Sequence, residues 1–257
     1  MKCWTLTLEF LVLFLLAWLN HRRILDGFNN WLVRPFPVSH KQAFLDVNQV
    51  FPEHQLLEKN WKEIQKEALN VLDITPSATK VSGAFFAGLN QQDKWKVFPL
   101  IFYGSDNEEN LNKCPTTKKL LKQIPRIKSA MFSVMEPGLF VKPHRGPFRG
   151  ILRYHLGLKV PPEHCFMNLN GTSYKWQEGQ DVLLDDTNEH FVLNHSNETR
   201  IVLFCDVERD YTEFGQTSNT LQSWINWFII YKSGLPNLLY NVNAANERAV
   251  PVFHPEL

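Results

Sequence analysis

Hydrophobic residues follow a different pattern in each part of the chain, and the first part is the simplest. Phe10 to Leu19 is an unbroken apolar run, and extended back to Cys3 it reaches 17 residues with three polar interruptions. A membrane-spanning helix needs about 20 apolar residues, with a lower limit of about 17. We therefore expect residues 3–20 to form a transmembrane anchor. A cleaved signal peptide and an ordinary buried helix are the alternatives, although no small-x-small cleavage pattern follows the run.

Basic residues around this run predict its orientation. Arg22, Arg23 and Arg34 follow it, whereas only Lys2 and the terminal amine precede it. Because positive residues favour the cytoplasmic side, we expect a single-pass membrane protein with a cytoplasmic body.

Helical spacing appears in two segments of the body. From Leu56 to Leu72, apolar residues recur every three or four positions and charged residues fill the other face, which predicts a helix. Cys114 to Lys122 opens with Pro115 and predicts a second, shorter helix. The sequence Pro35-Phe36-Pro37 predicts a linker, since residues that precede proline disfavour helix.

From about Ser129 the pattern changes to short runs rich in β-branched and aromatic residues, separated by turn residues. Many short strands at close spacing are typical of a jelly roll. We therefore expect a mainly β domain over residues 45–215, a cupin-like double-stranded β-helix with flanking helices. Its predicted strands are Met131–Met135, Leu139–Lys142, Gly150–Lys159, Cys165–Leu169, Asp181–Leu184, His190–Leu193 and Arg200–Asp206.

The last segment, residues 216–257, is expected to contain an amphipathic helix and a tail. Leu221, Trp224, Ile225, Phe228 and Ile229 form its apolar face. The helix lies either at a membrane interface, which its aromatic residues would suit, or against the outside of the barrel.

Composition narrows the functional classes. Hydrophobic residues make up 44% of the chain and charged residues 21%, as in a folded globular protein. The formal net charge of +1 argues against nucleic acid as a partner. The four cysteines are widely spaced without a CxxC pair, so we expect reduced, buried thiols rather than disulfides.

Three of the nine histidines, His144, His155 and His190, fall within the predicted β region. Imidazole suits ferrous iron, and a jelly roll can bring an early and a late strand together. His144 and His190 are 46 residues apart, a separation that allows two iron ligands from opposite ends of one barrel, and they are the candidate pair. The usual carboxylate ligand would stand two residues after the first histidine, but that position is Gly146.

The stretch from Phe132 to Asp206 resembles the aspartyl/asparaginyl β-hydroxylase family. The resemblance implies Fe(II), 2-oxoglutarate and O2 as the reactive components, hydroxylation of an unactivated C–H bond, and an iron site with two histidines and a glycine at the carboxylate position. It rests on Pro-Gly-x-x-x-x-Pro-His-x-Gly-Pro (137–147), Leu-Arg-Tyr-His-Leu-Gly-Leu (152–158), Trp-x-x-Gly (176–179), Asp-Asp-Thr-x-x-His (185–190) and Arg-x-Val-Leu-Phe-x-Asp-Val (200–207).

The resemblance also implies roles for the remaining polar residues. Arg200, with Ser133, corresponds to the pair that binds the distal carboxylate of 2-oxoglutarate. Arg153 and His155 correspond to the pair that holds the carboxylate beside the metal. Asp186 corresponds to a catalytic-site residue near the water on the iron, with a turn-capping aspartate as the alternative.

For both arginines the alternative is a surface ion pair, with Asp185 as a candidate partner.

The resemblance leaves the substrate open. One expectation is a lipid acyl chain, such as that of lipid A, which the predicted anchor favours. The other is β-hydroxylation of Asp or Asn in a peptide or protein. A third alternative is a catalytically inactive, membrane-bound binding module.

Overall fold

The computed structural model describes residues 21–34, 36–78, 93–103 and 105–210. The predicted anchor over residues 3–20 and the predicted C-terminal helix within 216–257 lie outside these ranges. Within them, no helix combines the length and hydrophobicity needed to cross a bilayer. The anchor and the C-terminal helix therefore stay predictions.

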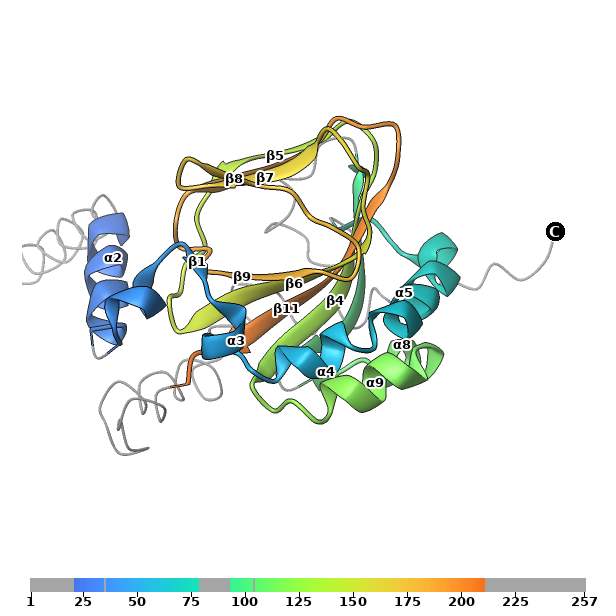
Figure 1. Ribbon diagram of the computed structural model, residues 1–257, viewed down its shortest axis with the longest axis horizontal. Coiled ribbons are helices and arrows are strands. Elements are labelled where there is room, and N and C mark those ends of the chain that lie inside the picture. Colours follow the sequence, from blue (N-terminus) through green and yellow to red (C-terminus); the bar gives the residue numbers. More distant parts are fainter. Residues whose placement is uncertain (1–20, 35, 79–92, 104, 211–257) are drawn as a thin grey trace, which may run out of the picture.

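Two antiparallel sheets face each other and form the predicted jelly roll (Figure 1). The larger sheet has the strand order β1 (Phe44–Leu45), β9 (Asp181–Leu184), β6 (Ile151–Lys159), β11 (Arg200–Glu208), β4 (Ile127–Met135), β2 (Trp95–Phe102) and β3 (Ser105–Asp106). The smaller sheet has the order β5 (Leu139–His144), β10 (His190–Asn194), β7 (Cys165–Leu169) and β8 (Thr172–Tyr174).

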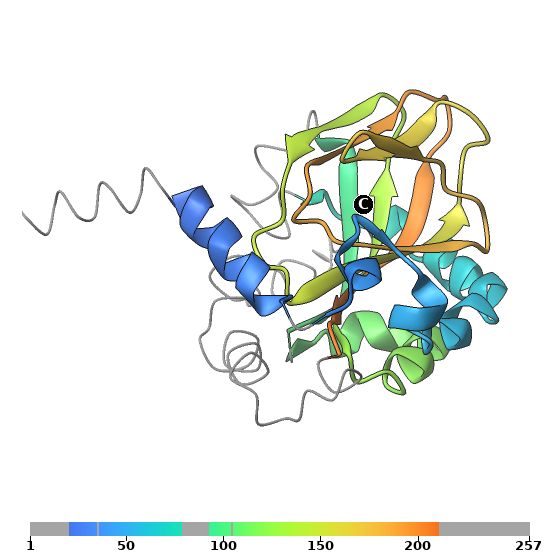
Figure 2. The ribbon, with the colours of Figure 1, turned by 60° about the vertical axis from the view of Figure 1, so that its left-hand side comes forward.

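Helices cover the face of the larger sheet that points away from the smaller one (Figure 1). An N-terminal helix, α2, instead projects from the side of the barrel (Figure 2). The helical elements are α2 (His21–Leu32), η1 (Val38–Lys41), α3 (Val47–Val50), α4 (His54–Glu58), α5 (Trp61–Asn70), η2 (Leu72–Ile74), α8 (Glu108–Lys113) and α9 (Pro115–Leu121).

The alternation of side chains along the central strands divides the interior into two parts. On β4, Phe132 and Val134 belong to the apolar core under the helices, whereas Met131 and Met135 belong to the core between the sheets. Successive residues of a strand point to opposite faces, so a central strand of this sheet is buried on both sides. Two polar residues from each of β4, β6 and β11 line the space between the sheets, where a site can form: Ser129, Ser133, Arg153, His155, Arg200 and Asp206.

The structure confirms the predicted strands within a few residues and adds elements that were not predicted, and three differences have a clear physical reason. The helix predicted from Leu56 to Leu72 is interrupted, because Asn60 has a non-helical backbone and its side chain donates a hydrogen bond to the carbonyl of Leu56. Strand β2 was not predicted, since it is buried on both faces and lacks alternation. Its Pro99 lies at a register shift, where a missing N–H is tolerated.

The third difference concerns the predicted linker. Helix α2 precedes it, and Phe36 is buried against Val33 rather than exposed. The expectation for the thiols is confirmed within the described residues, where Cys114, Cys165 and Cys205 are buried and unpaired.

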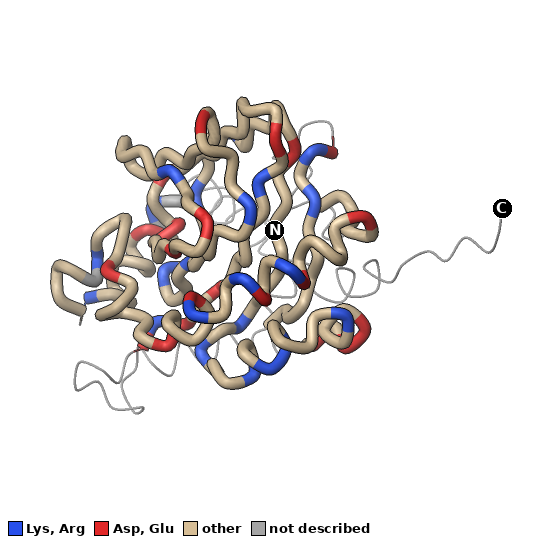
Figure 3. The backbone as a smooth tube through the Cα atoms, turned by 45° about the vertical axis from the view of Figure 1, so that its right-hand side comes forward, with Lys and Arg blue, Asp and Glu red and all other residues tan. Residues whose placement is uncertain are grey.

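Charged residues of both signs are interspersed over the described surface (Figure 3). This mixture agrees with the near-zero net charge of the whole chain.

Glu67 joins α5 to α9, and its replacement tests the helix layer. Its buried carboxylate accepts hydrogen bonds from the backbone N–H groups of Thr116 and Thr117 and from the Thr117 hydroxyl. We expect Glu67→Ala to lower the free energy of unfolding by about 2–3 kcal/mol, because three donors, two of them in buried hydrogen bonds, lose their acceptor. Urea denaturation measures this change. Glu63→Ala, on the exposed face of the same helix, is the control and should change it by less than about 0.5 kcal/mol.

Candidate active site

A cavity of about 350 Å³ lies between the two sheets. All the site residues predicted from the sequence line it, Asp186 from the turn between β9 and β10 and the others from strands: Ser133, His144, Arg153, His155, Asp186, His190 and Arg200. The geometry therefore brings the predicted set together, while the role of each residue stays a prediction.

His144 and His190 face each other because β5 and β10 are paired strands in which these two residues are register partners. Their ring centroids are 4.1 Å apart. In each ring, Nδ1 donates a hydrogen bond to the carbonyl oxygen two residues earlier, that of Lys142 at 2.8 Å and that of Asn188 at 2.9 Å. With the proton on Nδ1, each Nε2 keeps a lone pair, as a metal ligand requires.

Burial favours the neutral form of both rings. Burial and the neighbouring His190 lower the pKa of His144 to about 4. Burial also lowers the pKa of His190, although nearby Asp186 acts in the opposite direction. Both imidazoles are therefore neutral at pH 7, and a divalent cation would not have to displace protons from them.

Gly146 has a steric reason to be glycine. A Cβ atom at this position would lie 2.6 Å from Oδ2 of Asp186 and closer still to Oδ1 and Cγ. The Asp186 carboxylate thus fills the space that a side chain two residues after His144 would occupy. It is not placed as a third ligand: in the described part of the chain, no group including His144 and His190 has three ligand atoms within 4.8 Å of one another.

Arg153 already has two carboxylate partners. Its guanidinium forms ion pairs with Asp186 at 2.6 Å and Asp206 at 2.9 Å, and it stacks 4.1 Å from the ring centroid of Phe204. The alternative of a surface ion pair is wrong for this residue, because its side chain is only 11% exposed and both carboxylates are buried. Pairing with Asp185 is also wrong, since the arginine partners of Asp185 lie elsewhere.

Arg200 has a different environment. Its side chain is buried, and within the described residues its Nε and Nη1 have no hydrogen-bond partner. Nη2 donates to Sδ of Met135 at 2.6 Å, and the guanidinium lies 4.5 Å from the ring centroid of Trp176. Burial lowers the pKa of Arg200 to about 10, so the group remains a cation at neutral pH. A buried cation of this kind is costly, and an anionic ligand would offset the cost.

His155 and Ser133 add further hydrogen-bonding groups to the same cavity. Neither ring nitrogen of His155 has a hydrogen-bond partner within the described residues. Burial, assisted by Arg200, places the pKa of His155 well below its usual value, so the ring is neutral. The Ser133 hydroxyl accepts a hydrogen bond from Nε1 of Trp95 at 3.0 Å, which leaves its proton available to an acceptor.

Several residues that line the cavity or contact its lining were not predicted individually. Trp176, whose Nε1 lacks a partner in the described structure, and Asp206 lie within sequence motifs recognised above, but no role was assigned to them. Trp95 was missed because β2 was missed. Tyr103, which donates to Asp206 at 2.7 Å, left no signal in the sequence.

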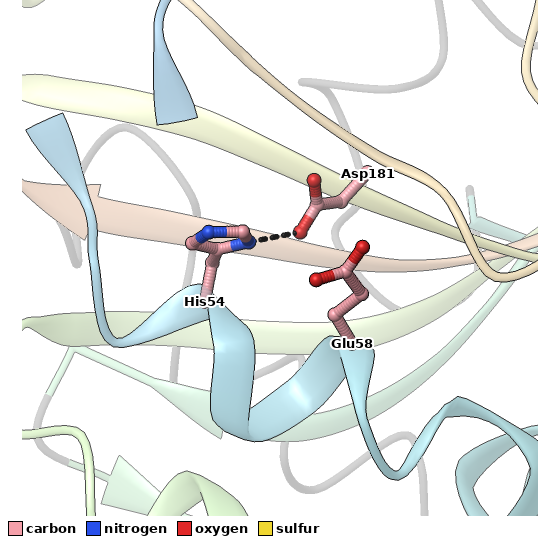
Figure 4. Close-up of side chains that lie close together, drawn as sticks. All are labelled: His54, Glu58 and Asp181. Atoms are coloured by element: carbon pink, nitrogen blue, oxygen red, sulfur yellow. Dashed lines mark hydrogen bonds and ion pairs between the residues drawn. The ribbon is translucent and has the colours of Figure 1, made fainter. Parts of the chain in front are cut away.

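A second group of metal-binding residue types lies outside the cavity (Figure 4). His54 and Glu58 of α4 and Asp181 of β9 place ligand atoms within 4.8 Å of one another. Hydrogen bonds account for this arrangement, since His54 Nδ1 lies 2.6 Å from an Asp181 oxygen that also accepts from Tyr154 at 2.9 Å. Nε2 of His54 lies 3.0 Å from Asn48 Oδ1. The group therefore braces α4 against the sheet and is distinct from the predicted iron site.

Comparison with known proteins shows which family this chain belongs to. The family model described as aspartyl/asparaginyl beta-hydroxylase matches residues 58–210, which is more than half of the chain. This chain belongs to the aspartyl/asparaginyl beta-hydroxylase family. The match begins in α4 and ends just after β11, so it includes all the predicted site residues of this family member.

Two relatives illustrate the range of the family. An ornithine lipid ester-linked acyl 2-hydroxylase from Rhizobium tropici is 33% identical over 185 residues, 70% of this chain and 63% of the relative. The human aspartyl/asparaginyl beta-hydroxylase is 35% identical over 159 residues, 59% of this chain and 20% of the relative. The chain thus matches less than two thirds of the length of either relative. A solved prolyl-4-hydroxylase from Pseudomonas putida aligns with 58% of this chain and 88% of its own, at 16% identity and a TM-score of 0.37.

The packing of Gly146 in this family member can be tested by one methyl group. We expect Gly146→Ala to lower the free energy of unfolding by about 1–3 kcal/mol, because the Asp186 carboxylate would have to move away from Arg153. Chemical denaturation measures the change. Gly27→Ala adds the same group where no atom lies within 4 Å and should be neutral or stabilising. Equal effects of the two substitutions would contradict this account of Gly146.

Proposed function

We propose that this protein is an Fe(II)- and 2-oxoglutarate-dependent dioxygenase that hydroxylates an unactivated C–H bond. The observation that carries the proposal is the juxtaposition of two neutral imidazoles, each with Nε2 available, and a buried arginine with unpaired donors in one cavity. Membership of a family whose relatives are named hydroxylases supports it.

His144 and His190 would hold the iron through Nε2, and their hydrogen bonds to backbone carbonyls would keep the rings oriented. Asp186, fixed by Arg153, would accept a hydrogen bond from water beside the metal. Bound iron, with 2-oxoglutarate and O2, supplies the oxidising chemistry, whereas the protein supplies position and a closed site.

The cosubstrate is a dianion, and the cavity offers donors for both of its ends. Arg200 would bind the distal carboxylate with two parallel N–H groups, with the Ser133 hydroxyl as a third donor. His155 and Arg153 would donate to the carboxylate beside the metal. Arg153 is already partly neutralised by its two carboxylate partners, so most of the electrostatic attraction would come from Arg200.

For the substrate we favour a lipid acyl chain. The apolar part of the cavity lining suits a flexible hydrocarbon, because thioether side chains adapt to irregular shapes. It consists of Trp95, Phe102, Met131, Met135, Val141, Met167, Leu184, Val192 and Phe204. The Rhizobium tropici relative is named as an acyl hydroxylase of a lipid. A membrane anchor at residues 3–20 and a cytoplasmic body would give access to such a substrate. Hydroxylation of an Asp or Asn residue, the activity named for the human relative, is the second candidate.

Single substitutions test the iron and cosubstrate sites. We expect His144→Ala and His190→Ala each to abolish succinate formation, because one imidazole cannot hold the metal alone. Arg200→Lys should raise the KM for 2-oxoglutarate by about 10- to 100-fold, since lysine lacks the forked pair of donors.

Succinate release from purified protein, with calorimetric binding of 2-oxoglutarate in the presence of Mn(II), provides the measurements. His164→Ala is the control, because His164 is exposed and does not line the cavity. Turnover that survived in either ligand variant would refute the two-histidine site. If the unmodified protein bound neither Mn(II) nor 2-oxoglutarate, the inactive binding module would be the better description.

The substrate class can be determined by mass. In cells with and without the gene, we expect a lipid species to differ by about 16 daltons, the mass of one inserted oxygen atom. Mass spectrometry of the total lipid and of digested total protein makes the comparison. A shift confined to peptides would favour the Asp/Asn alternative.

A further inference from the structure

The opening of the cavity lies beside helix α2. Among the described lining residues, Arg145 is exposed, His144, Arg153 and Phe204 are half-buried, and the others are buried. The cavity therefore opens at the loop that connects β5 to β6, residues 145–150. Helix α2 ends at the same side of the barrel (Figure 2).

Asn29 of α2 is hydrogen-bonded to this loop in both directions. Its Nδ2 donates to the carbonyl of Pro147 at 3.2 Å, and its Oδ1 accepts from the N–H of Arg149 at 2.9 Å. The side chain is buried, so these bonds are shielded from water. The helix is thus fixed to the segment that begins one residue after His144.

Arg149 extends the connection toward the predicted metal site. Its Nη1 donates to Asn30 of α2 at 2.8 Å, and its Nε pairs with the fully buried Asp185 at 2.6 Å. Arg209 pairs with the same oxygen of Asp185 at 2.8 Å. Two guanidiniums on one fully buried carboxylate resist displacement, because loss of either one weakens the compensation of a buried charge. A motion of α2 would therefore be transmitted to Asp186, the next residue in the chain.

The surface around the opening has features of a membrane-binding face. Cations are exposed on both components: Arg23 and Arg34 within and just after α2, and Lys142 and Arg145 on either side of His144. They outnumber the exposed carboxylates nearby, which are Asp26 of α2 and Glu189, 3.9 Å from Arg145. Phe28 and Trp31 of α2 stack with ring centroids 6.0 Å apart and are only half-buried. Aromatic residues and cations together favour the headgroup region of an anionic bilayer. The apolar run Phe10–Leu19 lies directly before α2 in the sequence.

We propose that α2 and residues 142–149 form a docking face for an anionic phospholipid bilayer, so that the cavity opens directly onto the membrane. This inference rests on the proposed function, since it specifies how a membrane-anchored hydroxylase receives an acyl chain. The bonds of Asn29 and Asn30 make α2 a rigid support rather than a flexible tether. An acyl chain then reaches the cavity without crossing water.

Spin labelling of the full chain in vesicles tests the docking face. In a Cys3→Ser background, a nitroxide is attached at Arg145→Cys on the opening or at Lys119→Cys on α9, behind the larger sheet. The vesicles contain phosphatidylcholine and phosphatidylglycerol. We expect vesicles to cause a several-fold loss of collisions between the label at position 145 and a water-soluble nickel chelate, with a gain in collisions with oxygen. The label at position 119 should not change.

The double variant Asn29→Ala, Asn30→Ala tests the rigid support. It should still float with vesicles but should lose the protection of the label at position 145. Asn30→Ala alone, at an exposed residue, serves if the double variant does not fold, as judged by thermal unfolding. If the chain floats and the label at position 145 stays in water, the docking face is refuted and the anchor stands. Failure to float refutes the anchor itself, whereas protection that survives loss of both asparagines refutes the support by α2.

Discussion

Burial of the central strands on both faces is the constraint on which the rest of the structure depends. Strands β4, β6 and β11 present apolar side chains to the helices and a mixture of charged and apolar side chains to the opposite sheet. Because side chains alternate with a period of two, a shift of one residue in register would exchange these two sets. The same pairing of β11 with its neighbours that closes the core therefore also places Arg200 opposite Met135 and Asp206 opposite Arg153.

The arginines inside or at the edge of the barrel differ in how their charge is balanced. Arg149 and Arg209 share Asp185, and Arg153 lies between two carboxylates. Arg200 has an aromatic ring and a sulfur atom as neighbours, and it forms no ion pair with a carboxylate of the described structure. In a medium of low polarity a cation of this kind is stable only with a compensating anion. Arginines that pair with the protein's own carboxylates have a structural role, whereas Arg200, which does not, is suited to an anionic ligand.

The turn that carries Asp185 and Asp186 joins the structural and the chemical parts of the molecule. One carboxylate is held by two arginines that contact the loop and helix at the opening, and its neighbour fills the space beside Gly146. Adjacent residues in a tight turn cannot move independently. The position of α2, the shape of the loop after His144 and the environment of the histidine pair are therefore determined together.

The jelly roll and most strand positions could be predicted from the amino-acid sequence, because alternation is a local property of the chain, and the motifs of the family resemblance supplied the residues that meet in the cavity. The sequence did not predict β2, whose burial on both faces removes the alternation, or the break at Asn60, where a side-chain bond to the backbone ends a helix. Which arginine forms an ion pair with which carboxylate became known only from the three-dimensional structure. The sequence places Asp185, Asp186 and Asp206 near several cations, but ion pairing depends on distances between strands that are far apart in the chain. The contact of α2 with the opening was likewise visible only in the three-dimensional structure. Hydrogen bonds between residues about 120 positions apart leave no periodic signal in the sequence.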